Sequence, residues 1–401
     1  MPDTLSEPVK LPTERPTALD PPTALGRLRS EDPITPMAFP DGHIGWLVTS
    51  HFLARAVLAD PRFSARQELH HHPAFDHPFG QEQIQPAEPG SFIGMDPPDH
   101  TRYRKLLTRH FTTRRIKELA TRIEEIVEAR LDALEGAGRG ADLIEEFALP
   151  IPTLMICEIL GVPYDEQDMF RHDVATFFRL DSTLEETHGA YANMLAYLGQ
   201  LVPRKRAKPG SDLISTLIEG EELSDQEIAT MALVVLIAGH ETTASMLGLG
   251  VFALLTHPEE WARLRDDPSL MDGAVEELLR YLPLFRAGLM RTALVDVELG
   301  GRQVKAGQCL VLQLSSANRD PQHFEGDPER FDPTRRATGH LAFGHGVHQC
   351  LGHQLARVEL RIAYGALLRR FAGLRLAVPA EEVPLGTDMA IYGVHRLPVT
   401  W

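Results

Sequence analysis

The chain has 401 residues, of which 43% are hydrophobic, so it can bury a large core. Its 56 acidic residues outnumber 40 Lys and Arg, and the formal net charge of −16 argues against general binding to nucleic acid or to an anionic membrane. Three scattered cysteines, Cys157, Cys309 and Cys350, argue against a disulfide framework and favour a reducing compartment, by default the cytoplasm. The longest purely apolar run, residues 231–238, is too short to span a membrane, and residues 1–22 contain no apolar signal region.

The expected elements divide the chain into a short lead and one domain. Residues 1–22 are polar and rich in proline, and we expect a partly flexible lead followed by a single domain over residues 23–401. Residues 67–89 are rich in His, Pro, Gln and Gly without periodicity, which is typical of a long functional loop. Helical patterns dominate residues 100–280, and a helix is expected after Cys350. Strands are expected at residues 45–50, 293–299, 308–314, 374–378 and 397–401.

A long central helix is predicted over residues 225–257. Ser224 and Glu227 have the spacing of a capping box, and no proline follows until Pro258. The stretch MALVVLIAG is apolar nearly all round, which is typical of a helix that crosses the protein interior.

The middle of this helix carries polar residues that are expensive to bury. Gly239, His240, Glu241 and Thr242 interrupt the apolar run, and such a local cost suggests a function. Ala244 stands where a HExxH zinc site needs its second histidine, so we expect no zinc there. A kinked helix with a hydrogen-bonded polar cluster is the structural alternative.

The segment FGHGVHQCLG, residues 343–352, places Cys350 in a glycine-rich loop before a helix expected to begin near Leu351. Unpaired backbone N–H groups at a helix start stabilise a thiolate. Gly344 and Gly352 would let a flat ligand approach the main chain closely. A strand-to-helix turn with an inert buried cysteine is the alternative interpretation.

Three further patterns are ambiguous alone. Glu277 and Arg280 are spaced as an i, i+3 pair, usually a weak surface ion pair. Residues 102–117 hold seven basic residues and no acid, which is either a solvated helix face or a docking surface. The run His70, His71 and His72, with His77 nearby, could bind a metal, although histidine-rich loops usually do so weakly.

Taken together, these segments resemble the cytochrome P-450 family. The motifs DPPDHTRYR, AGHETT, EELLR, FDPTR and FGHGVHQCLG occur in the family's order, and the resemblance covers about residues 23–401. It implies a mainly α protein with small β-sheets, the P-450 fold, with a long distal helix and a cysteine haem loop. It also implies haem b held by the Cys350 thiolate, which favours O–O cleavage. The expected reaction uses O₂, two electrons and two protons to hydroxylate or epoxidise a mostly apolar small molecule.

The resemblance also implies roles for individual residues. Glu241 and Thr242 become the proton-delivery pair. Glu277, Arg280 and Arg335 become a structural network behind the haem. The residues expected to bind haem, including those for its propionates, are His100, Arg104, Ala238, Gly239, Arg291, Phe343, Gly344, His348, Cys350 and Gly352.

The family's substrate-facing segments correspond to residues 67–93, 177–180, 284–289 and 388–391. Arg286 either meets a substrate oxygen or anion, or points outward to the haem edge. The apolar pocket candidates are Ile93, Phe177, Phe178, Leu180, Phe285, Leu289, Met389 and Ile391.

The expected partners follow from the absence of a fused flavin or iron–sulfur module. A separate ferredoxin and ferredoxin reductase would supply electrons, docking on Arg102, Lys105, Arg109 and Arg115.

The resemblance implies a monomeric cytoplasmic enzyme of secondary metabolism, acting on a macrolide or another polyketide. A haem sensor without turnover and a peroxide-driven or coupling catalyst are the alternatives; intact Glu241 and Thr242 argue against the sensor.

Overall fold

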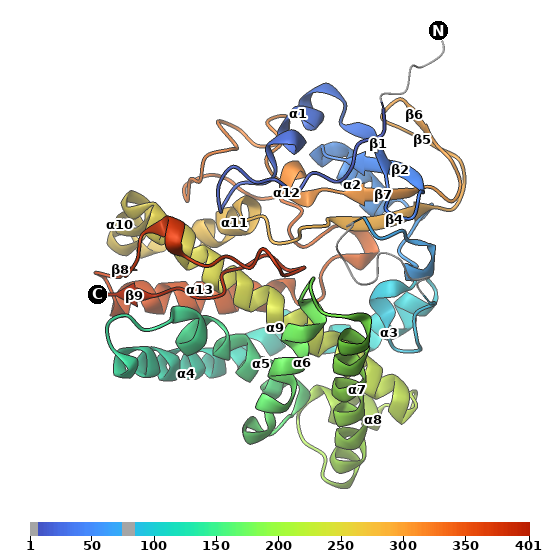
Figure 1. The fold of residues 1–401 in the computed structure, drawn as a ribbon. Helices are drawn as coiled ribbons and strands as arrows, with labels where there is room; N and C mark the ends of the chain where they lie inside the picture. The colour runs from blue at the N-terminus through green and yellow to red at the C-terminus, as the bar shows by residue number, and fades with distance from the viewer. Residues whose placement is uncertain (1–6, 74–84) are drawn as a thin grey trace.

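The predicted central helix is α9, Asp225–Thr256, in a computed structural model that describes residues 7–73 and 85–401. It lies in the middle of the molecule, with helices packed around it (Figure 1). The Ser224 hydroxyl accepts from the Glu227 N–H and the Glu227 side chain accepts from the Ser224 N–H, so the capping box is confirmed. By length and composition α9 alone, within the described ranges, could cross a membrane, but 67% of its apolar window is buried, as in the core helix of a globular protein.

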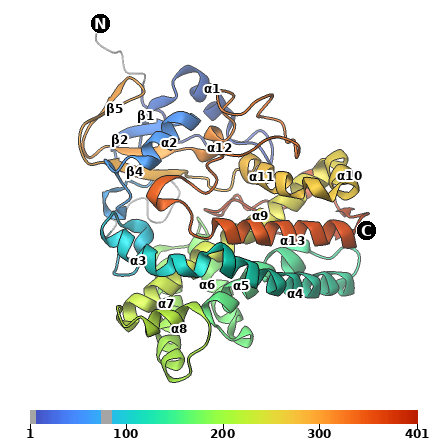
Figure 2. The same ribbon diagram turned by 180° about the vertical axis from the view of Figure 1, so that it is seen from behind.

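Helices on either side of α9 bury its apolar surface. α5 (Pro150–Leu160), α7 (Leu184–Ala207) and α13 (His353–Arg370) pack against it, and α13 also lies along α4 (Thr113–Ala137) (Figure 2). The other helices are α1 (Thr23–Glu31), α2 (His51–Ala59), α3 (Asp99–Thr108), α6 (Asp168–Phe178), α8 (Leu213–Glu219), α10 (Pro258–Asp266), α11 (Met271–Tyr281), α12 (Leu314–Ala317) and the π-helical turn η5 (Ile144–Ala148).

A five-stranded sheet stands beside this helical body, next to α1, α2 and α12 (Figure 1). Its order is β1-β2-β7-β4-β3; β2 and β7 are parallel and the other pairs antiparallel. Two-stranded sheets join β5 to β6 and β8 to β9. The strands are β1 (Ile34–Ala38), β2 (Ile44–Val48), β3 (Phe63–Ser64), β4 (Leu289–Ala293), β5 (Val297–Leu299), β6 (Arg302–Val304), β7 (Cys309–Leu312), β8 (Arg375–Leu376) and β9 (Val399–Thr400).

The other expected strands differ by one or two residues at their ends, and two further differences from the prediction have a visible cause. The strand expected at residues 293–299 is two strands in different sheets, with β4 ending at Ala293 and β5 beginning at Val297. Between them Asp296 accepts hydrogen bonds from the Lys305 ammonium and the Ala306 N–H, 2.8 and 3.0 Å away, which turn the chain. The helix expected from Leu351 begins two residues later, because residues 351 and 352 form a turn.

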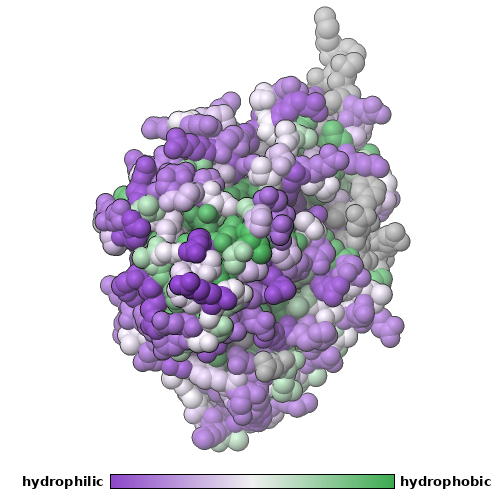
Figure 3. Space-filling view, turned by 60° about the vertical axis from the view of Figure 1, so that its left-hand side comes forward, coloured by the Kyte–Doolittle hydropathy of each residue, from purple (hydrophilic) through white to green (hydrophobic). Residues whose placement is uncertain are grey.

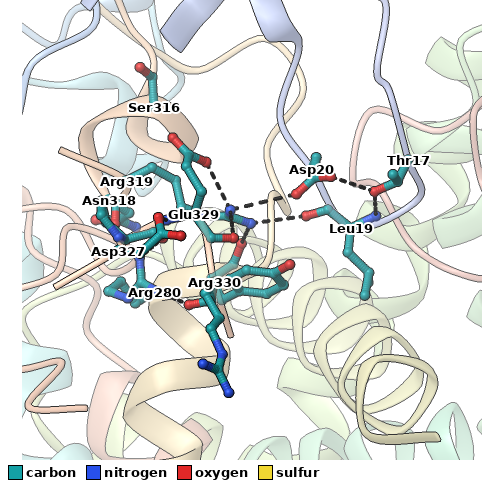
Figure 4. Close-up of polar contacts among 12 residues, drawn as sticks. Thr17, Leu19, Asp20, Arg280, Ser316, Asn318, Arg319, Asp327, Glu329 and Arg330 are labelled. Atoms are coloured by element: carbon teal, nitrogen blue, oxygen red, sulfur yellow. Dashed lines mark hydrogen bonds and ion pairs between the residues drawn. The ribbon is translucent and has the colours of Figure 1, made fainter. Parts of the chain in front are cut away.

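The N-terminal segment packs on the domain as far as the structure describes it. Val9 pairs with Met37 as a parallel bridge, and Leu19 is buried. Arg319, fully buried, donates to the carbonyl oxygens of Leu19 and Tyr281 at 3.2 and 3.0 Å, and its guanidinium lies over the Tyr281 ring (Figure 4). The division into a lead and one domain stays a prediction.

The surface is mostly hydrophilic on the face seen in Figure 3, where polar side chains surround one apolar area. This agrees with the high content of charged residues, 24% of the chain. Large apolar side chains that are more than half exposed within the described ranges are Phe52, Ile93, Met169 and Val347.

Candidate active site

The Cys350 loop is closed by backbone contacts before α13 begins. The Cys350 N–H donates to the Phe343 carbonyl at 2.9 Å, and Gly344 and Gly346 adopt φ angles of +66° and +74°. A Cβ on Gly346 would lie 2.3 Å from the Leu58 carbonyl oxygen, so only glycine lets the loop pack on α2. The glycines therefore shape the loop that holds the cysteine side chain.

The electrostatics of Cys350 differ from the expectation of a thiolate stabilised by its surroundings alone. Cys350 is an exposed residue, yet the atoms packed around its thiol desolvate it enough to raise its pKa, although the Gly352 and His353 N–H groups and the cations of Arg104 and Arg357 act in the opposite direction. The helix-start donors are present, but desolvation outweighs them. Deprotonation therefore requires a further positive charge, which a coordinated metal ion provides.

An ion-pair cluster that the sequence did not single out lies behind this loop. Arg357 stacks over the Phe343 ring at 4.6 Å and donates to the Glu276 carboxylate at 2.5 and 2.9 Å, and His340 lies 3.1 Å from the same carboxylate. Burial acts to raise the pKa of Glu276, but the hydrogen bonds from His340 and Arg357 lower it to about 2. The available signal was positional: Arg357 lies near the start of the helix that follows Cys350.

Four predicted propionate ligands come together from separate elements. His100 on α3 and His348 in the cysteine loop have ring centroids 4.0 Å apart, and Arg104 donates to the Gln349 carbonyl oxygen. Both ring nitrogens of His100 and Nε2 of His348 are buried without a hydrogen-bond partner among the residues described. Arg291, 8% exposed on β4, forms no ion pair with any described residue.

The charges of this cluster indicate an anionic ligand. Burial first, and then nearby cations, lower the pKa of His100 to about 4 and that of His348 to about 3. Burial also lowers the pKa of Arg291 to about 10, opposed only by Asp96. Donors crowded in this way are stabilised by carboxylates, which accept several charge-assisted hydrogen bonds at once. Two propionate groups fit this requirement.

The polar middle of α9 turns its side chains in different directions. Thr242 Oγ1 donates to the Ala238 carbonyl at 2.7 Å, and Ala238 is itself exposed. A Cβ on Gly239 would lie 2.5 Å from Ile156 Cδ1 on α5, so any contact of Gly239 with a cofactor is made by its backbone. Burial raises the pKa of Glu241 to about 7, although His395 and Ser245 act to lower it.

Glu277 and Arg280 are both fully buried, unlike an ordinary surface pair. Arg280 donates to the Glu277 carboxylate at 2.7 and 2.8 Å and to the carbonyls of Asn318 and Pro328 at 2.8 and 2.9 Å. Arg335 Nε lies 3.2 Å from the same carboxylate. The structure therefore joins the three residues of the expected network around one buried carboxylate.

Three of the segments predicted to face the substrate meet, although they are far apart in the sequence. Ala390 N–H donates to the Phe178 carbonyl at 2.8 Å, and Phe285 forms a β-bridge with Ile391. Leu289 Cδ1 lies 3.9 Å from the Cβ position of Gly344, which brings this group to the cysteine loop. Phe177, Leu180 and Met389 lie in the same segments. The Leu180 N–H donates to the Asp388 carbonyl, and Arg179 forms a β-bridge with Met389. The rings of Phe177 and Phe178 pack edge to face.

Other pocket candidates are placed less centrally. Ile93 is 58% exposed, and Arg286 donates to the Thr387 carbonyl oxygen, near Arg15 and Tyr392. His70 Nε2 lies 3.4 Å from the Ser64 carbonyl, and His71 Nδ1 lies 2.5 Å from an Asp41 carboxylate oxygen. His77 and much of the loop expected over residues 67–89 lie outside the described residues, and substrate contacts of Arg286 stay a prediction.

The four cations predicted to dock ferredoxin differ in whether they pair with acidic residues of this chain. Arg102 pairs with Glu227 at 3.1 Å, and Arg115 pairs with an acid on its own helix at 3.2 Å. Lys105 and Arg109 are exposed and form no ion pair with any residue in the described ranges. Lys105 lies on α3 and Arg109 begins the 3₁₀ turn directly after it. The α3 helix lies beside the loop that leads into α13 (Figure 2).

Comparisons with known proteins decide the family. The family model "Cytochrome P450" matches residues 199–376. "Cytochrome P450 105C1" of a Streptomyces species is 47% identical over 399 residues, which is 99% of this chain and 100% of that protein. The chain belongs to the cytochrome P450 family. "Nocardicin C N-oxygenase" of Nocardia uniformis is a P450 relative 44% identical, with 96% of this chain and 97% of that one covered.

The fold is also that of solved P450 structures. The crystal structure of CYP105P1 in complex with filipin I is 42% identical, covers 98% of this chain and 99% of its own, and has a TM-score of 0.92. The protein is therefore a P450 monooxygenase whose cofactor is haem with a cysteine thiolate ligand. Such an enzyme needs O₂, electrons from a redox partner and a small-molecule substrate, and its relatives include enzymes of antibiotic and other secondary metabolism. Cys350 and the unpaired ring nitrogens of His100 and His348, beside the buried guanidinium of Arg291, fit this cofactor.

Proposed function

We propose that the enzyme hydroxylates or epoxidises a mostly apolar secondary metabolite, such as a macrolide or another polyketide. One observation carries this proposal: the apolar segments at 177–180, 284–289 and 388–391 meet, and Leu289 reaches Gly344 of the cysteine loop. A site lined in this way favours apolar ligands with few polar contacts. Relatives named pentalenic acid synthase and a structure with filipin I support the substrate class.

The cofactor and the protein would divide the work. When bound, haem with its thiolate ligand supplies the chemistry of oxygen activation and C–H oxidation. Cys350 would bind its iron as a thiolate, His100, Arg104, Arg291 and His348 would hold its propionates, and the backbone of residues 238 and 239 would contact its ring.

The protons would come from α9. Because burial raises its pKa to about 7, Glu241 can carry a proton at neutral pH and release it. The Thr242 hydroxyl, 2.7 Å from the Ala238 carbonyl, would turn from that acceptor toward the reacting oxygen and direct the proton.

Replacing Thr242 tests this assignment. In Thr242→Ala the consumption of reductant should continue while product formation falls and hydrogen peroxide accumulates, because the hydroxyl that directs protons is gone. The matched variant Thr230→Val, at a buried threonine on the same helix, should keep the wild-type ratio of product to reductant. An unchanged ratio in Thr242→Ala would remove Thr242 from the proposal.

The electron donor would be a separate ferredoxin, reduced by its own reductase. Lys105 and Arg109 are the exposed cations best placed to dock it, because Arg102 and Arg115 already pair with acids of this chain. The double variant Lys105→Glu and Arg109→Glu should slow reduction by ferredoxin and flatten its dependence on salt. Arg139→Glu, an exposed change beyond the end of α4, is the control; equal rates in both variants would contradict the docking site.

Substrates can be screened without turnover. We expect a macrolide or related polyketide to shift the spin state of the ferric enzyme on titration, and polar metabolites of similar size to leave it unchanged. The reverse order of responses would refute the apolar assignment. We further expect the enzyme to act as a cytoplasmic monomer, which sedimentation of the purified holoenzyme tests for the oligomeric state.

A further inference from the structure

His240 is a buried polar residue that the mechanism above does not use. Its side chain is 1% exposed, and Nε2 lies 2.8 Å from Thr153 Oγ1 on α5. Its Nδ1 is buried without a hydrogen-bond partner among the described residues, and Glu241 Oε2 lies 3.8 Å from it. A fully buried imidazole with one free nitrogen is expensive unless that nitrogen has a task.

Thr153 can switch its hydroxyl proton between two acceptors. Thr153 Oγ1 lies 2.7 Å from the Leu149 carbonyl and 2.8 Å from His240 Nε2. When the hydroxyl donates to Leu149, the imidazole must carry its proton on Nε2 to complete the bond to Thr153. When the hydroxyl donates to Nε2, the neutral imidazole carries its proton on Nδ1, on the side of Glu241.

Thr153 also borders a polar cavity on the outer side of α5. This cavity, between α4, η5, α5 and α6, has a volume of about 230 Å³ and is lined by Thr153, Leu149, Arg130, Glu145 and Arg171, among others. Water occupies roughly 30 Å³ per molecule, so the cavity has room for several hydrogen-bonded waters. Arg130 Nε, buried without a partner among the described residues, adds a donor there.

We propose that this cavity, Thr153 and His240 form the path by which Glu241 regains its proton in each turnover. The proposal rests on the proposed role of Glu241 as proton donor. Each turnover takes up O₂, one substrate, two electrons and two protons, and releases oxidised product and one water. Each proton that leaves the Glu241 carboxyl is replaced from His240 Nδ1, while Nε2 takes a proton from Thr153, Thr153 takes one from water in the cavity, and that water regains one from bulk solvent. Rotation of the neutral imidazole ring then returns its N–H to the Glu241 side for the next proton.

The charges around the path keep the relay neutral. Burial first, and then Arg171 in the cavity wall, lower the pKa of His240 to about 4, so no positive charge accumulates on the imidazole at neutral pH. On the other side of Glu241 lie Ser245 and His395, and His395 pairs with Asp388 at the surface. A path through His395 is therefore the rival route.

The direct test measures exchange at Glu241 without turnover. The ferric holoenzyme at pH 6 is mixed with D₂O, and the infrared band of the protonated Glu241 carboxyl, identified by its loss in Glu241→Gln, is followed as it shifts on deuteration. We expect His240→Leu and Thr153→Val each to slow this exchange at least tenfold, and the control Thr230→Val to leave it unchanged. Unchanged exchange in both relay variants, or slowing by His395→Gln instead, would overturn the path.

Measurements during turnover test separately whether the path exists and whether Glu241 is the proton donor. With ferredoxin and O₂, the two relay variants should lose roughly tenfold or more of product formed per reductant, the scale of general acid catalysis. With hydrogen peroxide, which brings its own protons, they should match Thr230→Val. If the relay variants slow the exchange but form normal product per reductant, the path stands and Glu241 is rejected as the proton donor. If the relay variants also lose peroxide-driven activity, the active site is damaged and the relay is rejected as the cause of the loss.

Discussion

Glu359 on α13 makes a quantitative prediction about pH and stability. Its side chain is 4% exposed, and Oε2 has no hydrogen-bond partner among the residues described. Burial alone raises the pKa of Glu359 from 4.5 to about 8. The folded protein therefore holds this proton across a range of pH in which the unfolded chain has already lost it.

The direction in which stability changes with pH follows from the number of protons that the folded and unfolded states bind. The folded state binds more protons than the unfolded state between pH 4.5 and about pH 8, so the free energy of unfolding falls as the pH rises through this range. At about 1.4 kcal/mol per pH unit the full loss approaches roughly 5 kcal/mol, and the part between pH 6 and pH 8 is about 2 kcal/mol. Below the unfolded pKa the loss vanishes.

The variant Glu359→Gln removes the ionisable carboxyl and keeps a side chain of nearly the same size and shape. Urea unfolding of the holoenzyme, followed by far-ultraviolet circular dichroism, should show the variant gaining about 2 kcal/mol on the wild type between pH 6 and pH 8. The exposed change Glu381→Gln should follow the wild type at both pH values. The reasoning is refuted if Glu359→Gln and the wild type lose stability in parallel over this range.

Four further predictions concern the site. Arg280→Ala should destabilise the fold by about 3–5 kcal/mol and release haem on purification, because it leaves the buried Glu277 carboxylate without its main partner; normal haem content and urea midpoint would contradict this. Arg291→Leu should speed haem transfer to apomyoglobin severalfold, and an unchanged transfer rate would remove Arg291 from the propionate site. Cys350→Ala should lose the thiolate-type spectrum of the reduced, carbon monoxide-treated protein, and retention of that spectrum would refute its assignment. Product formed per reductant should fall as the pH rises above about 7, because the Glu241 carboxyl then loses its proton; a flat profile in wild type, equal to that of Glu241→Gln, would argue against this role.

The parts of the fold that the sequence predicts are those set by local rules. The α9 helix is an example, because its capping box at Ser224 and its apolar interior both act within one helix. The division of residues 293–299 into two strands was missed because it depends on Asp296 accepting bonds from residues nine and ten positions later. A local sequence pattern does not predict such contacts between a side chain and residues nine or ten positions away.

The candidate site divides in the same way. The cysteine loop and the buried pair of Glu277 and Arg280 stand out as motifs, and the structure adds their partners. The cluster of Glu276, His340 and Arg357 has no local pattern, because it joins three segments that meet only after α11 and α13 pack together. The pocket segments converge through backbone bonds between distant parts of the chain, which periodicity alone does not reveal.

The polar run in α9 illustrates why a recognised motif left His240 without a role. Successive residues of a helix turn by about 100°, so His240, Glu241 and Thr242 cannot all face one cofactor. The structure directs His240 to Thr153 on α5, Glu241 to the neighbourhood of Ser245 and Thr242 back to the Ala238 carbonyl, while the chain stays helical throughout. The same turn of helix therefore carries the hydrogen-bonded contact of His240 with Thr153 and the proposed proton-delivery pair. His240 lies on the α5 side, where Thr153 borders the polar cavity, and the Thr242 hydroxyl lies at the carbonyl of the exposed Ala238.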